Sequence, residues 1–108
     1  MDLSKMRDRE LVETFAALAV KIDETDLDLV SSGKRLSSAM SGIRKIIFKR
    51  MNNGKSQANK ILLQTVAVSA IKANSNGLAS SRLHCIDLID QVVAEMPETQ
   101  NERQIEVA

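Results

Sequence analysis

Apolar residues recur at intervals of three and four along most of this 108-residue chain, and this spacing constrains its fold more than any other feature. A helix turns once in about 3.6 residues, so side chains at such intervals share one face. The clearest run is Leu36, Met40, Ile43, Ile47 and Met51. We find no strong strand or hairpin pattern and no internal repeat. The sequence therefore predicts an all-α protein, a compact bundle of four to five helices.

The first predicted helix lies in the acidic N-terminal part of the chain. The second lies largely in the basic segment that follows. The first covers residues 4–23, with Ser4 as a plausible N-cap. The second begins behind a cap at Thr25 and runs toward Met51. Gly33 is a weak point within it, because glycine costs about 1 kcal/mol relative to alanine inside a helix. The sequence leaves open whether this is one helix or two helices joined at Gly33.

The third and fourth predicted helices are richer in alanine, valine and isoleucine. The third covers about residues 56–73 behind a cap at Ser56, and the fourth covers about residues 79–96 behind Ser80 or Ser81. Apolar residues surround most of the third segment. A helix that is apolar nearly all round is usually buried on several sides, so we expect this helix at the centre of the core.

Length and composition indicate one helical domain, residues 1–97, followed by a flexible polar tail, residues 98–108. A chain of this size buries only a modest core, so we expect a homodimer. The N-terminus has no apolar signal segment, and the longest uncharged apolar run, residues 61–71, is too short to span a bilayer. We expect a soluble cytoplasmic protein with no membrane partner.

Charge is segregated along the chain in a way that its near-neutral total conceals. Residues 1–30 carry four basic and eight acidic side chains, whereas residues 31–72 carry nine basic and no acidic ones. Residues 73–108 carry two basic and six acidic side chains. A basic centre between two acidic flanks is the feature that points most directly toward function, because it suggests a surface for a polyanion.

We interpret the basic centre as a surface for the phosphates of duplex RNA or DNA, in a regulatory or architectural protein. Phe15 and Phe48 are the only aromatic residues, so the chain lacks the stacked rings that bind single strands. The candidate contacts lie on the second predicted helix and the turn after it. They are Lys34, Arg35, Arg44, Lys45, Lys49, Arg50, Lys55 and Lys60.

Three other interpretations of this segment remain open. The acidic first and last helices could neutralise the basic one by packing beside it, which would fix the order of the helices in space. Alternatively the protein is a helical module that binds another protein, as an anti-regulator, secretion chaperone or assembly subunit. Its adaptable contacts would be Met40, Ile46, Phe48 and Met51. The basic amphipathic helix could also lie on a membrane surface, although it lacks tryptophan.

Candidate catalytic, metal and nucleotide motifs are incomplete. Gly54-Lys55-Ser56 lacks the earlier glycine and the strand that a P-loop requires. His84 and Cys85 are single residues of their kinds, and neighbours on a helix point about 100° apart, which suits neither nucleophilic catalysis nor a zinc site. Cys85 falls on an apolar stripe and is predicted to be a core residue. We therefore expect a non-enzymatic protein without cofactor or metal.

Overall fold

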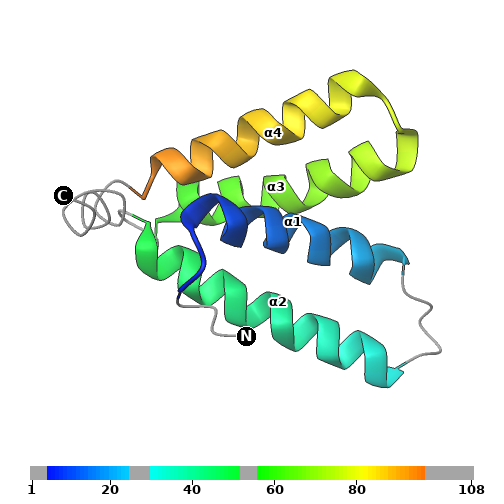
Figure 1. The fold of residues 1–108 in the computed structure, drawn as a ribbon, viewed down its shortest axis with the longest axis horizontal. Coiled ribbons are helices and arrows are strands. Elements are labelled where there is room, and N and C mark those ends of the chain that lie inside the picture. Colours follow the sequence, from blue (N-terminus) through cyan, green and yellow to red (C-terminus); the bar gives the residue numbers. More distant parts are fainter. Residues whose placement is uncertain (1–4, 25–29, 52–55, 97–108) are drawn as a thin grey trace.

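The computed structural model describes residues 5–24, 30–51 and 56–96, with the backbone alone for residues 30–33. These residues form four helices and no strand, which confirms the all-α prediction (Figure 1). The homodimer stays a prediction. The helices are α1 (Asp8–Glu24), α2 (Val30–Arg50), α3 (Gln57–Asn76) and α4 (Ala79–Ala94).

Successive helices run antiparallel, and α1 lies between α2 on one side and α3 and α4 on the other (Figure 1). It packs against all three, whereas α2 and α3 make few contacts with each other. The prediction that the third helix occupies the centre is therefore wrong. Ile61 and Val68 of α3 are 54% and 58% exposed, because the apolar side chains around this helix exceed what its two partners cover.

The core joins large side chains from every helix. Phe15 of α1, Ile47 of α2, Leu63 of α3 and Met96, just beyond α4, are almost completely buried. Ile47 belongs to the apolar run predicted for the second helix, and Leu63 belongs to the third segment, which is apolar on most sides. Full burial of such a side chain contributes about 1.5–3 kcal/mol, so this shared cluster fixes how the four helices meet.

The first helix begins four residues later than predicted, at Asp8. Its expected cap, Ser4, lies outside the described residues. Before Asp8, the carbonyl oxygen of Met6 accepts a hydrogen bond of 2.7 Å from the Arg50 guanidinium. This part of the chain therefore makes its polar contact with α2 and does not extend α1.

Helix α2 is continuous through Gly33, which settles the alternative that the sequence left open. The predicted cap at Thr25 lies outside the described residues. One uninterrupted helix of 21 residues spans about 31 Å. All the basic side chains from Lys34 to Arg50 are therefore carried on one rigid element.

The junction of α3 and α4 differs from its prediction. Ser56 caps α3 as expected, accepting a hydrogen bond of 3.2 Å from the amide of Asn59. The helix continues beyond residue 73 to Asn76, and Gly77 ends it in a left-handed conformation (φ 67°). Neither Ser80 nor Ser81 caps α4, because the N-cap position is occupied by Leu78.

No side chain among the described residues caps α4, and the side chain of Asn76 instead bridges this junction. Its oxygen accepts from the amide of Leu78 at 2.8 Å, and its nitrogen donates to the Ser81 hydroxyl at 2.9 Å. One asparagine thus links the end of α3 to the start of α4.

In the described part of the chain, no helix combines the length and apolar character needed to cross a membrane.

Candidate nucleic-acid interface

Helix α2 presents four exposed basic side chains, those of Lys34, Arg35, Lys45 and Lys49. At 100° per residue, Lys34, Lys45 and Lys49 point to the side of the helix opposite the core residues Ile43 and Ile47, and Arg35 points close beside them. We call these four residues the outer stripe. It extends about 22 Å along the helix axis, from residue 34 to residue 49.

Two more predicted contacts lie beside the outer stripe. One is on the side of α2 that faces α3, and the other is on α3 itself. Arg44 is exposed, and its guanidinium carbon lies 5.8 Å from the centre of the Phe15 ring, a cation–π distance. Lys60 is exposed in the first turns of α3. Both line the same groove, so the structure brings together two cations that are sixteen residues apart in the sequence.

Arg50 lies differently from the other candidate contacts. Its side chain is 12% exposed and bonds Asp8, at 3.1 Å, and the Met6 carbonyl oxygen. Its guanidinium therefore ties the end of α2 to the start of α1, and we leave it out of the proposed phosphate surface. Lys55 lies outside the described residues.

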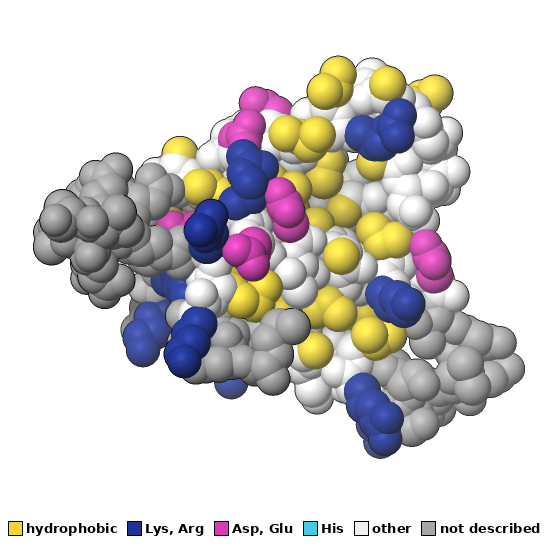
Figure 2. Space-filling view, viewed as in Figure 1, with side chains coloured by type: hydrophobic (Ala, Val, Ile, Leu, Met, Phe, Trp, Pro, Cys, Tyr) yellow, Lys and Arg dark blue, Asp and Glu magenta, His cyan; other side chains and the backbone are white. Residues whose placement is uncertain are grey.

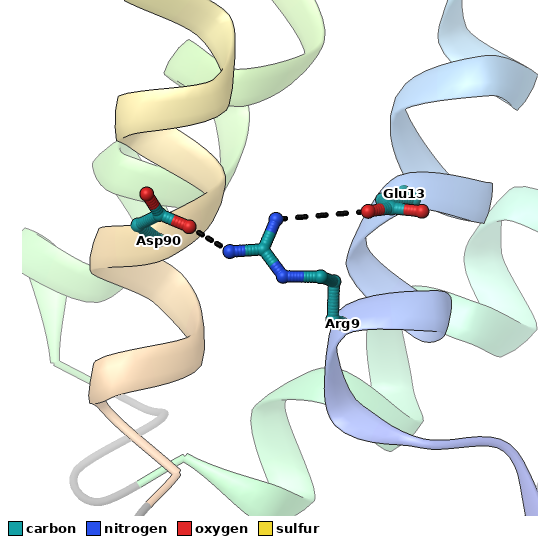
Figure 3. Close-up of polar contacts among 3 residues, drawn as sticks. All are labelled: Arg9, Glu13 and Asp90. Carbon is teal, nitrogen blue, oxygen red and sulfur yellow. Dashed lines mark hydrogen bonds and ion pairs between the residues drawn. The ribbon is translucent and has the colours of Figure 1, made fainter.

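Apart from the Asp8–Arg50 pair, the ion pairs of the described acidic side chains lie within α1 or between α1 and α4. Arg9 of α1 lies between Glu13 of the same helix, at 3.6 Å, and Asp90 of α4 (Figure 3). Figure 2 shows acidic side chains over α1 and α4 with basic side chains among them, and further basic side chains along the edge formed by α2. Among the described residues, Arg50 alone of the predicted contacts forms an ion pair.

The space between α2 and α3 is an open groove of about 420 Å³. It exists because α2 packs on α1 and makes few contacts with α3. Its walls are mostly apolar and its charged residues are basic. The lining residues are Phe15, Met40, Arg44, Phe48, Lys60, Leu63, Gln64 and Ala67.

Sequence reasoning identified the basic residues of the groove but missed the groove itself. The sequence predicts Met40 and Phe48 as contacts for another protein but not the groove that they share, and in the structure both are half-buried and face this space. The periodicity of one helix shows which side chains share a face, but not whether a neighbouring helix covers them. Gln64, among the apolar residues of α3, was the available signal that this side of the helix faces water.

Cys85 is a buried core residue, as predicted, and His84 beside it is exposed. Burial raises the pKa of the Cys85 thiol above its usual range, and a side-chain hydrogen bond with Ser69 partly opposes this effect. The thiol is therefore the less reactive protonated form at neutral pH. Among the described residues, no three His, Cys, Asp or Glu side chains come together as a metal ion would require.

No protein-family model matches the chain, and neither a curated protein nor a solved structure is significantly similar to it. What the protein does has to be inferred from its own residues and geometry.

Proposed function

We propose that this protein binds the phosphate backbone of duplex RNA or DNA through α2 and the adjoining start of α3. The contacts are the outer stripe of α2 together with Arg44 and Lys60. Binding of this kind recognises charge and backbone shape, and it suits a regulatory or architectural protein without enzymatic activity.

The observation that carries this proposal is that the described residues supply no counter-ion for these side chains. Within the described residues, none of the six forms an ion pair, while the carboxylates of Asp8, Glu13 and Asp90 pair with Arg50 or Arg9. The ion pairs of the described residues therefore do not support the alternative in which the acidic helices neutralise these six cations of α2 and α3. Cations on a rigid helix that have no counter-ion among the described residues favour a polyanion as their partner.

The dimensions of the outer stripe also suit a duplex. Its length of about 22 Å corresponds to roughly six base pairs, because base pairs rise about 3.4 Å along the axis. Lys45 and Lys49 stand one helical turn apart and can neutralise neighbouring phosphates. Each neutralised phosphate releases condensed counter-ions, which is the main source of affinity in such complexes.

Charge reversal tests the proposal. The double variant Lys45→Glu/Lys49→Glu should abolish binding to a short duplex, while the helical circular dichroism spectrum stays that of the parent protein. Lys72→Glu provides the matched control, since Lys72 is exposed on α3 and does not line the groove. Equal affinities of the double variant and the parent for a duplex would refute the proposal.

Binding of a protein helix is the second candidate function, and the groove is the observation that favours it. Of the four contacts predicted for this function, Met40 and Phe48 line the groove, Ile46 is half-buried elsewhere on α2, and Met51 is buried in the core. Substituting Met40→Asp, in the groove, should weaken an apolar protein contact more than it weakens phosphate binding. This variant therefore distinguishes the two functions.

We also propose that the protein forms a homodimer, which would place two outer stripes on one particle. Leu83 and Ile86 of α4 are 65% and 48% exposed. Figure 2 shows hydrophobic side chains gathered over the first half of this helix. Clustered exposed aliphatic side chains mark contact surfaces in soluble proteins, so this part of α4 supports the dimer.

A further inference from the structure

The groove between α2 and α3 combines an apolar interior with charge of a single sign. Phe48 and Leu63 contribute apolar walls, and Gln64 contributes a polar amide. Arg44 and Lys60, which we call the rim cations, are exposed on opposite walls. No acidic residue occurs among the described lining residues. The chemistry that fits is therefore a large aliphatic side chain flanked by carboxylates.

This chain contains such a segment. Residues 98–108 carry three glutamates and one arginine, and Ile105 stands among them between Glu102 and Glu106. The flanking glutamates are four residues apart. An aliphatic residue with a carboxylate on each side complements an apolar groove with a cation on each wall.

We propose that residues 98–108 bind back into this groove, with Ile105 against Phe48 and with Glu102 and Glu106 facing the two rim cations. The groove is then a docking site for the protein's own C-terminal segment. The proposal does not rest on nucleic-acid binding, but it shares Arg44 and Lys60 with the proposed phosphate surface, so the docked segment and a duplex would compete for these two cations.

The position of the end of α4 allows this contact. In the antiparallel arrangement, α4 ends at the same end of the bundle at which α2 ends and α3 begins (Figure 1). Phe48 and Lys60 lie within about one turn of those two helix ends. Eight residues lie between Met96 and Ile105, and the nine residue-to-residue steps can extend about 30 Å. Because the end of α4 lies at the end of the bundle where the groove helices α2 and α3 meet their ends, the groove is within this reach (Figure 1).

Tethering reduces the affinity that the contact requires. A short segment attached to its own binding site has an effective concentration in the millimolar range, so an affinity of about 1 mM already populates the docked state. The contact between glutamates and exposed cations should weaken with salt, because charges are screened over about 3 Å at 1 M ionic strength.

A spin label on the segment measures the contact directly. Cys85 is the only cysteine, so the full chain carrying Cys85→Ala and Gln104→Cys accepts one nitroxide, close to Ile105. In the amide NMR spectrum, the signals of Phe48, Lys60 and Gln64 should fall below half of their intensity with the reduced label. Signals of Arg82 and His84, near the other end of the bundle, should keep theirs. Full intensity at the groove residues, or a uniform loss, would overturn the proposal.

A charge swap tests the assignment of the rim cations. In the labelled chain, Lys60→Glu should restore the groove signals, and Lys60→Glu combined with Glu106→Lys should reduce them again. Lys72→Glu, elsewhere on α3, should change nothing. Docking that is indifferent to Lys60→Glu would show that these charges do not hold the segment.

The occupant can also be distinguished from a second copy of the chain. Labelled protein without ¹⁵N is mixed with ¹⁵N-labelled protein without nitroxide. Loss of the groove signals in this mixture would mean that the segment comes from another molecule, and it would overturn docking within one chain. Neither measurement contains nucleic acid, so failure of this inference and failure of the proposed function are separate results.

Discussion

The guanidinium of Arg50, at the end of α2, lies 3.1 Å from the carboxylate of Asp8, the first residue of α1. The two side chains are 12% and 3% exposed, and Arg50 also bonds the Met6 carbonyl oxygen. This is a buried charge pair that joins two helix ends. This pairing distinguishes Arg50 from its neighbour Lys49, whose side chain is exposed.

We predict that Arg50→Ala lowers the free energy of unfolding by about 3–5 kcal/mol, because it leaves the Asp8 carboxylate buried without this counter-ion. Urea denaturation measures the change. Lys49→Ala is the matched control and should stay within about 0.5 kcal/mol of the parent. In a double-mutant cycle, Asp8→Ala and Arg50→Ala should be non-additive by about 0.5–3 kcal/mol. Additive effects would mean that the pair contributes no coupling.

Substitution by alanine should change stability in opposite directions at Gly77 and Gly42. Gly77 has φ 67°, so Gly77→Ala should cost about 1–2 kcal/mol. Gly42 lies inside α2 with open space where a methyl group would be added, so Gly42→Ala should stabilise the protein by about 0.5–1 kcal/mol. Thermal or urea unfolding of both variants checks this pair. Destabilisation by Gly42→Ala would mean that α2 does not run continuously through this position.

Cys85 should react slowly with a thiol reagent, because burial both shields its sulfur and raises its pKa. At pH 8, native protein should react several-fold more slowly than protein in denaturant. The chain carrying Cys85→Ala and Ser80→Cys, with its exposed cysteine, provides the fast reference. Equal native rates for the two cysteines would contradict the buried placement.

The same pKa shift predicts a pH dependence of stability. In the folded protein the Cys85 thiol keeps its proton at pH values where the unfolded chain loses it. Its contribution is therefore fully present below the unfolded thiol's pKa of about 8.5 and decreases as the pH rises above it. The difference in unfolding free energy between the parent and Cys85→Ala should shrink from pH 8 to pH 10. A difference that grows over this range would contradict the direction of the shift.

Periodicity predicted the helices well because each stripe of apolar residues is buried by at least one neighbour. It did not predict which helix is central, since that depends on packing partners. Ile61 and Val68 look like core residues in the sequence, yet they lie on the side of α3 that no other helix covers. The junction of α3 and α4 shows the same limit. Asn76 and Ser81 are five residues apart, and their contact depends on the turn at Gly77.

The candidate site was predictable as a set of residues, but not as a surface. Segregation of charge identified all the basic side chains of α2. Which of them face water depends on how α2 packs against α1, and this packing places Arg50 against Asp8. The groove arises from the weak contact between α2 and α3, which no pattern within a single helix records.

The most direct test of the central claim is the salt dependence of binding to short duplex RNA, duplex DNA and a single strand, measured by fluorescence anisotropy. The account predicts micromolar or tighter binding to a duplex at low salt. For duplex DNA, each neutralised phosphate adds about −0.9 to the slope of log K against log salt, so six contacts give a slope of about −5 per chain. Lys45→Gln/Lys49→Gln should make it shallower by about two. No binding even at low salt, or an affinity independent of salt, would contradict the claim that α2 is a phosphate-binding surface.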